Sequence, residues 1–210
     1  MAKSGHYTKL TQLITRWIVY HRMKDMQEIE LAPSYQIEVW TSKNISPESL
    51  IEDIKQFSQL STNAFGETIG MKYDEAAEYL MNFVNSVVVI REDNSHRIVG
   101  YSIAEPSTQV YPDNDLYTDR KPTIDTAYLT ITVIAPSKRG QHLFEHLELA
   151  LKTELVVKGF EYLEIDASAE VADGKESFAD KIIKNNSDRI VETKIHTSPL
   201  GKQMYIRMKL

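Results

Sequence analysis

The sequence has 210 residues, of which 42% are hydrophobic, and it carries a formal net charge of -6 and no cysteine. A chain of this size can bury a sizeable core, while the lack of cysteine excludes disulfides, thiolate metal sites and a cysteine nucleophile. The acidic balance argues against a nucleic-acid partner and favours a cationic one. Because the start of the chain lacks the apolar core of a signal peptide and no apolar run reaches the ~20 residues that span a bilayer, we expect a cytoplasmic protein without a membrane partner.

Residues 1–32 are predicted to be a helical extension of a domain that covers residues 33–210. Within residues 8–27, apolar side chains recur at three- and four-residue steps, which indicates an amphipathic helix. Its apolar face contains Leu10, Leu13, Ile14, Trp17, Ile18 and His21. This face can pack on its own domain or form a homodimer contact. A membrane-surface helix is a third alternative, disfavoured because the polar face is not strongly basic.

Two helices are predicted after a first strand from Tyr35 to Trp40. Ser46-Pro47-Glu48 is typical of a helix start, since it offers a capping hydroxyl, a fixed φ and an acid near the helix dipole. The first helix is expected to end at Gly66, and the second to run from Asp74 to about Val84. Their inward faces are predicted to contain Leu50, Ile51, Ile54, Phe57, Leu60 and Ala64 in the first and Ala76, Ala77, Leu80 and Phe83 in the second.

A β-hairpin over residues 87–104 and a long polar segment follow these helices. The polar segment separates Glu105, at the end of one strand, from Thr126, at the start of the next. Loops of this length in a compact domain are usually functional or disordered. The aspartates of this segment could attract an ammonium group, and its tyrosines could stack on the carbon chain that carries that group. A solvated loop without substrate contact could have the same composition. These aspartates and tyrosines are Asp113, Asp115, Asp119, Asp125, Tyr111 and Tyr117.

The segment from Thr126 to Ser168 is predicted to form a strand, a turn, a helix and a second strand. β-Branched and aromatic residues fill residues 127–135, and Pro136 ends that strand. The helix presents one apolar face and stops at Gly159. That face contains Leu143, Leu147, Ala150, Leu151 and Leu155. The turn before the helix is a place for an anion, because backbone N–H groups point out of a helix N-terminus.

The end of the chain is predicted to add a helix over about residues 175–184 and a hairpin over residues 189–208. Lys194, Lys202, Arg207 and Lys209 make this end locally basic. Such residues could contact a phosphate or nucleic acid, but lysines on edge strands also serve to prevent association.

The turn between the central strand and helix resembles a motif of the GNAT superfamily of acyl-CoA-dependent N-acetyltransferases, Arg/Gln-x-x-Gly-x-Gly/Ala. Its residues here are Arg139, Gly140, Gln141, His142, Leu143 and Phe144. Arg139 and Gly140 agree with the family, whereas His142 and Phe144 stand where it has glycine and glycine or alanine. The resemblance, which covers roughly residues 33–210, implies a mixed, mainly antiparallel α/β sheet flanked by helices, here with the extra N-terminal helix.

The resemblance also implies acetyl-CoA as the cofactor. The turn residues Arg139 to Phe144 would hold its pyrophosphate, and a backbone amide of the central strand, near Val133, Ile134 or Ala135, would donate to the oxyanion. Family members often carry a tyrosine acid in Asn-x-x-Ala-x-x-x-Tyr, where this chain has Glu176, Ala179 and Ile183. A thiolate with a pKa of about 8.5 can leave without a dedicated acid.

The acceptor amine must lose a proton before it can attack, which a carboxylate can assist. As general base we favour Glu105, with Asp125 and Tyr128 as alternatives. His142, His146 and His196 are candidate proton carriers by residue type only, and no spacing indicates a metal site.

The sequence thus predicts an N-acetyltransferase that acts on a primary amine of a small molecule or a protein. One alternative is a GNAT-fold protein without activity that binds or assembles through its N-terminal helix. A second is a GNAT-fold modifier of nucleic-acid bases, against which the acidic charge argues.

Overall fold

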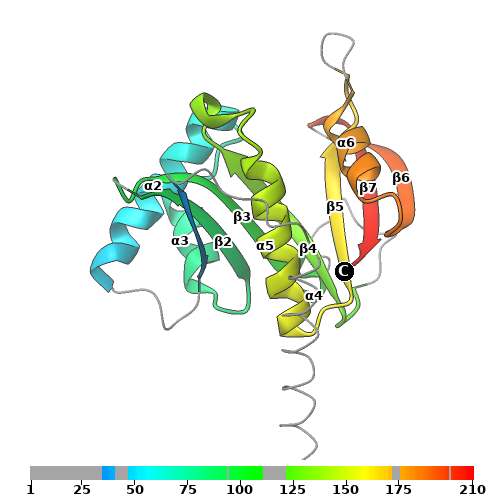
Figure 1. The fold of residues 1–210 in the computed structure, drawn as a ribbon, viewed down its shortest axis with the longest axis horizontal. Helices are drawn as coiled ribbons and strands as arrows, with labels where there is room; N and C mark the ends of the chain where they lie inside the picture. Colours follow the sequence, from blue (N-terminus) through cyan, green and yellow to red (C-terminus); the bar gives the residue numbers. More distant parts are fainter. Residues whose placement is uncertain (1–34, 41–46, 94, 111–121, 172–175, 199) are drawn as a thin grey trace, which may run out of the picture.

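The protein is represented by a computed structural model that describes residues 35–40, 47–93, 95–110, 122–171, 176–198 and 200–210. The predicted extension over residues 1–32 lies outside these residues. The described strands form one seven-stranded sheet in the order β1-β2-β3-β4-β5-β7-β6 (Figure 1). The ladder between β4 and β5 is parallel, and the other five are antiparallel. The predicted mixed, mainly antiparallel sheet with flanking helices is therefore confirmed.

The elements that precede the central crossover form the first half of the sheet, and all but the short α4 follow the predicted order. They are β1 (Tyr35–Trp40), α2 (Pro47–Phe65), α3 (Tyr73–Met81), β2 (Ser86–Glu92), β3 (Ile98–Pro106) and the short α4 (Ser107–Val110). The crossover and the second half comprise β4 (Thr126–Ile134), the 3-10 turn η2 (Pro136–Lys138), α5 (Leu143–Lys158), β5 (Tyr162–Ser168), α6 (Phe178–Asn185), β6 (Ile190–Ser198) and β7 (Gly201–Lys209).

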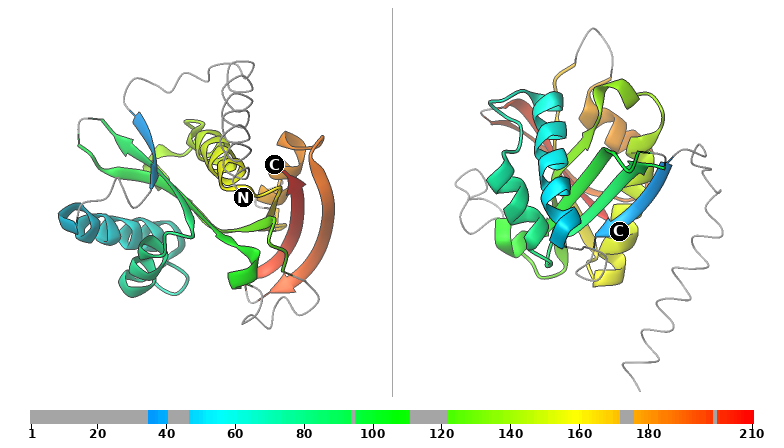
Figure 2. Two further views of the ribbon diagram at one scale, coloured as in Figure 1. Left: turned by 90° about the horizontal axis from the view of Figure 1, so that it is seen from below. Right: turned by 90° about the vertical axis from the view of Figure 1, so that its left-hand side faces the viewer.

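Helices cover the sheet from both sides, with α2 and α3 on one face and α5 on the other (Figure 2). The contacts of β3 show which side chains face which layer. The ring of Tyr101 stacks on Phe57 of α2 with centroids 4.1 Å apart, whereas a Cβ at Gly100 would lie 3.3 Å from Leu147 Cδ1 of α5. Because strand side chains alternate, Glu105 faces the α2 and α3 side, as Tyr101 does. Phe178 of α6 meets Phe144 of α5, which places α6 on the α5 side.

Two predicted core positions are wrong, although the helices that carry them are confirmed. Ile51 is 54% exposed, because it lies away from the face on which Ile54 and Phe57 are buried. Phe83 is 56% exposed, because α3 ends at Met81 and the chain turns at Asn82. The short helix α4 is an addition in what the sequence predicted as loop, while residues 111–121 of that loop lie outside the described part. No helix in the described part is long and apolar enough to span a membrane.

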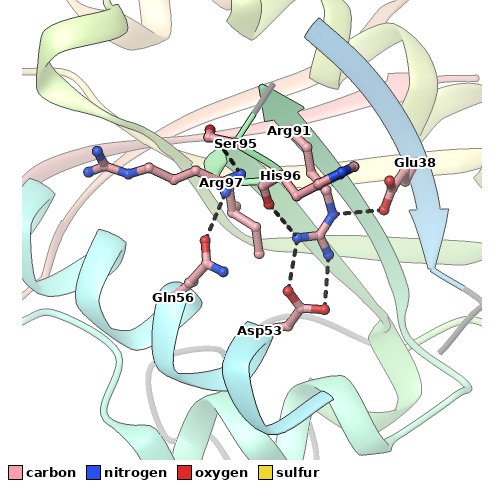
Figure 3. Close-up of polar contacts among 8 residues, drawn as sticks. Glu38, Asp53, Gln56, Arg91, Ser95, His96 and Arg97 are labelled. Carbon is pink, nitrogen blue, oxygen red and sulfur yellow. Dashed lines mark hydrogen bonds and ion pairs between the residues drawn. The ribbon is translucent and has the colours of Figure 1, made fainter. Parts of the chain in front are cut away.

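The guanidinium of Arg91 joins β1, α2 and the β2–β3 turn (Figure 3). It donates twice to the carboxylate of Asp53 at 2.9 Å, to Glu38 Oε2 at 2.9 Å and to the carbonyl of His96 at 3.1 Å. A cavity of about 830 Å³ lies against this cluster, lined by Glu38, Glu52, Asp53 and Arg91 among others. The charged groups that line this cavity are already paired with one another or, in the case of Glu52, with Lys55 at 3.8 Å. We therefore interpret the cluster as structural.

We predict that Asp53→Ala lowers the free energy of unfolding by about 3 kcal/mol, because it leaves the buried charge of Arg91 without its bidentate partner. Glu52→Ala, one residue earlier on α2, is the matched control. Its side chain is 64% exposed, so its loss should change stability by less than about 1 kcal/mol. Urea denaturation measures both. Equal stability of the two variants would show that the Arg91 cluster does not hold α2 on the sheet.

Candidate active site

The central feature of the site is the place where β4 and β5 stop pairing. Their ladder joins Thr126–Leu129 to Tyr162–Ile165, yet β4 continues to Ile134 and β5 to Ser168. Thr130 is an extra residue in β4, since Ile131 pairs with Ile103 and Leu129 with Ala104. A bulge of this kind bends a strand and increases its twist. The two strands thus separate from Thr130 onward, toward the start of α5 (Figure 1).

Backbone N–H groups of β4 line the gap between the two strands. The N–H of Ala135 donates to the carbonyl of Val99 on β3 at 2.8 Å. Because successive amides of a strand point to opposite sides, those of Ile134 and Thr132 point away from β3, toward β5. Of the three expected donors, Ile134 has the amide with this direction. The amides of Ala135 and, by the same alternation, Val133 are turned to β3.

The turn from η2 to α5 combines two residues in left-handed conformation. Gly140 has φ 81° and His142 has φ 58°, and a Cβ at Gly140 would meet nothing within 4 Å. His142 is the residue before α5 and makes no side-chain cap. The first amides of α5 have no carbonyl of their own helix to bind, so they are available to an anion. His142 therefore keeps the backbone conformation that a glycine would adopt, and its ring, 78% exposed, lies 3.3 Å from Glu145 Oε1.

A cavity of about 280 Å³ lies between this turn and α6. Cationic side chains line it from both sides, Lys138 and Arg139 from the turn and Lys181 from α6. Glu145 is the one carboxylate among the described lining residues. Leu143 is 2% exposed and holds the helix on the sheet, while the ring of Phe144 packs edge-on against Phe178 at 5.2 Å. The cavity is therefore positively charged and suits an anionic group.

Contacts from β1 and the β2–β3 turn hold the turn before α5 in place. The hydroxyl of Tyr35 donates to Gln141 Oε1 at 2.7 Å. Lys138 Nζ lies 2.5 Å from Glu92 Oε1 and 5.5 Å from the centre of the Tyr35 ring. These contacts occupy Gln141 and Lys138. The side chain of Arg139 has no partner within the described residues.

Glu105 lies on the other face of the sheet, next to the bulge. Its carboxylate accepts a hydrogen bond from Thr130 Oγ1 at 2.5 Å. Burial raises the pKa of Glu105, the bond from Thr130 opposes this rise, and the negative charge of Glu78 adds to it. Burial, followed by the charge of Glu105, likewise raises the pKa of Tyr79 to about 12. The structure thus places a half-buried carboxylate of raised pKa beside the gap.

Asp125, one of the two alternatives to Glu105, occupies a different place. It precedes β4, at the end of the ladder away from the gap, and hydrogen bonds, first from Thr123, hold its pKa below the ordinary value. A carboxylate of lowered pKa is a weaker base than one of raised pKa. The structure brings Glu105, and not Asp125, to the bulge.

Tyr128, the other alternative, belongs to a hydrogen-bonded chain that the sequence did not indicate. Its hydroxyl donates to Asp166 Oδ2 at 3.1 Å, and Asp166 Oδ1 lies 2.7 Å from Nε2 of His196. Asp166 is the first residue of β5 beyond the β4–β5 ladder. These groups come from three strands that are distant in sequence. The residue types of Tyr128 and His196 were the available signals, and neither pointed to Asp166.

The remaining expectations for proton carriers concern two helices. His146 is buried on α5 with a pKa lowered by that burial, so it is part of the core. Helix α6 is confirmed, and it carries Ile183, which the sequence analysis placed at the position of the tyrosine in the motif of the resemblance. No group of three potential metal ligands occurs among the residues that the structure describes.

Comparison with solved structures identifies the fold. An aminoglycoside 6′-N-acetyltransferase complexed with coenzyme A is 14% identical with a TM-score of 0.56, and the match covers 83% of this chain and 96% of that one. The structure of yncA from Salmonella typhimurium with its cofactor acetyl-CoA is 13% identical with a TM-score of 0.55, and the match covers 84% of this chain and 94% of that one. The ribosomal-protein-S18-alanine N-acetyltransferase from Escherichia coli is 15% identical with a TM-score of 0.52, and the match covers 84% of this chain and 92% of that one. No protein-family model and no curated protein matches the sequence. The chain has the fold of the GNAT acetyltransferases, as its turn motif predicted.

We predict that His142→Gly raises the free energy of unfolding by about 0.5–1 kcal/mol, because a left-handed conformation is costly for any residue with a Cβ. His96→Gly is the matched control, since His96 has φ 53° and lies away from the turn. Both variants should become more stable in urea denaturation. The exposed ring of His142 should contribute nothing to coenzyme A binding, so loss of affinity in His142→Gly alone would contradict the observed orientation.

Proposed function

We propose that the protein is an N-acetyltransferase that uses acetyl-CoA and acts on a primary amine. The observation that carries this proposal is the juxtaposition of two sites at one gap. The positively charged turn of Arg139 and Gly140 lies where the gap meets α5, and half-buried Glu105 lies beside the bulge of β4. An anionic cofactor and a cationic acceptor would thus approach one another from opposite faces of the sheet.

The residues at the start of α5 fit coenzyme A. The free amides of Leu143 and Phe144, the side chain of Arg139 and the open space above Gly140 would hold its pyrophosphate. The amide of Ile134 would donate to the acyl carbonyl oxygen in the gap. When bound, acetyl-CoA supplies a thioester whose acyl carbon forms a bond to the amine nitrogen as the bond to sulfur breaks. Relatives in fold that carry coenzyme A or acetyl-CoA support this assignment.

Glu105 would accept the proton of the acceptor ammonium. Its carboxylate is held in one orientation by Thr130, and its raised pKa makes it a better base than an exposed glutamate. Glu75 and Glu78 of α3 add negative charge close enough to raise the pKa of the neighbouring Tyr79. This surface favours a cation over a neutral or anionic acceptor.

The first test is a titration of the protein with coenzyme A and acetyl-CoA, followed by calorimetry and by melting temperature. At about a hundred times the dissociation constant, a bound ligand should stabilise the fold by roughly 2.7 kcal/mol. For a domain of this size, that corresponds to a rise of about 5 to 10 °C in Tm. No binding up to millimolar concentration would overturn the proposal and favour a GNAT-fold binding or assembly protein.

We predict that Glu105→Gln lowers kcat by about a hundredfold or more with a reactive amine acceptor, because it removes the base but keeps the shape. Since the carboxylate must be ionised, wild-type activity should fall as the pH drops through the pKa of Glu105, which lies above that of an exposed glutamate. This acidic limb should disappear in the variant.

Asp125→Asn is the matched control for Glu105→Gln, because it removes the other candidate carboxylate, at the far end of the β4–β5 ladder. It should leave kcat and the acidic limb close to those of wild type. Loss of the limb in Asp125→Asn, with the limb intact in Glu105→Gln, would reassign the base to Asp125.

A further inference from the structure

We infer that Lys181 of α6 binds the pyrophosphate of coenzyme A from the side opposite Arg139, forming a two-sided clamp with the start of α5. The inference rests on the proposed function. It adds a residue from a helix outside the turn motif, and nothing in the local sequence around Lys181 indicates this role.

One face of α6 forms a wall of the cavity at the start of α5. Phe178, Lys181 and Asn185 all line this cavity, and they recur at steps of three and four residues, which is one side of a helix. The adjacent side of α6 is buried, with Ala179 0% and Ile182 1% exposed. The helix is thus fixed on the sheet with Lys181 directed toward the cavity that the turn lines from the other side.

A local cap fixes the start of α6, and one aromatic contact sets its position against α5. Ser177 and Asp180 form a reciprocal capping box, with Ser177 Oγ accepting from the N–H of Asp180 at 3.1 Å. Phe178, the first residue of the helix, packs edge-on against Phe144 at 5.2 Å. Lys181 lies one turn after Phe178, so this aromatic contact holds it at the level of the first turn of α5.

Of the cations that line the cavity, Lys181 and Arg139 are available to a ligand. Lys138 is engaged by Glu92 and by the Tyr35 ring. The side chains of Lys181 and Arg139 have no hydrogen bond or ion pair within the described part of the chain. A pyrophosphate brings at least two negative charges, and neutral amides alone do not balance them.

The left-handed histidine gives a reason for a second cation. His142 carries a Cβ at a point where the backbone approaches a phosphate, which limits that approach compared with glycine. A lysine has a long stem and three donors that can meet a phosphate from a distance. Lys181 would thereby offset the contact that the turn loses through His142.

The test compares Lys181→Met with Lys184→Met by calorimetric titration with coenzyme A. Both substitutions remove one positive charge from α6, but Lys184 is 69% exposed and paired with Glu176 at 3.0 Å. Lys181→Met should bind coenzyme A roughly tenfold or more weakly than wild type, the effect of a lost charge-assisted hydrogen bond. Lys184→Met should bind like wild type, and Lys181→Arg should recover most of the affinity. The melting temperature of each free variant checks its folding.

A second titration, with 3′-dephospho-coenzyme A, distinguishes the pyrophosphate from the 3′-phosphate. If Lys181 binds the pyrophosphate, Lys181→Met loses the same factor of affinity with both ligands. A penalty that vanishes with the dephospho compound overturns the pyrophosphate assignment. Equal affinity of Lys181→Met and wild type for coenzyme A overturns the clamp but leaves the proposed function intact. Failure of the wild-type protein to bind coenzyme A overturns both.

Discussion

The parallel ladder between β4 and β5 is the constraint on which the rest of the site depends. It joins only Thr126–Leu129 to Tyr162–Ile165, although both strands are longer. Each strand has an antiparallel partner on its other side, β3 for β4 and β7 for β5. Each strand therefore stays hydrogen-bonded within the sheet where β4 and β5 no longer pair with one another. The two halves of the sheet can therefore separate beyond the bulge at Thr130 while each remains intact. Helix α5 connects them, and its first turn lies where the separation is open.

The charges on the two faces of the sheet differ in sign near this gap. On the α5 side, Arg139 and Lys181 face a cavity with little acidic lining. On the α2 and α3 side, Glu105 lies near Glu78, and burial rather than a counter-ion dominates its pKa. Since the sheet itself separates the two sites, an anionic ligand and a cationic one can each be bound without competing for the same surface. The net acidic charge of the chain therefore does not reveal that the two faces of the sheet carry charges of opposite sign near the gap.

The turn before α5 shows how a chain can keep a backbone conformation while losing the residue that usually adopts it. His142 has φ 58°, in the region that glycine enters without cost. Neighbouring contacts support this conformation, because Tyr35 holds Gln141 and Glu92 holds Lys138 on either side of Gly140. Leu143 then anchors the helix in the core. β1 and the β2–β3 hairpin thus hold the turn in which His142 takes this conformation.

The sequence by itself determined the elements that local periodicity and punctuation specify. The strand before Pro136, the helix that ends at Gly159 in left-handed conformation and the motif at Arg139 were all predictable, because each depends on residues adjacent in the chain. The place of Glu105 at the end of a strand was also predictable, since β3 ends at Pro106. The tertiary structure alone decided that β7 lies between β5 and β6, that Asp166 meets His196, and that Lys181 faces the turn. Those arrangements depend on strand order and on helix packing between distant segments, which the spacing of residues along the chain does not specify.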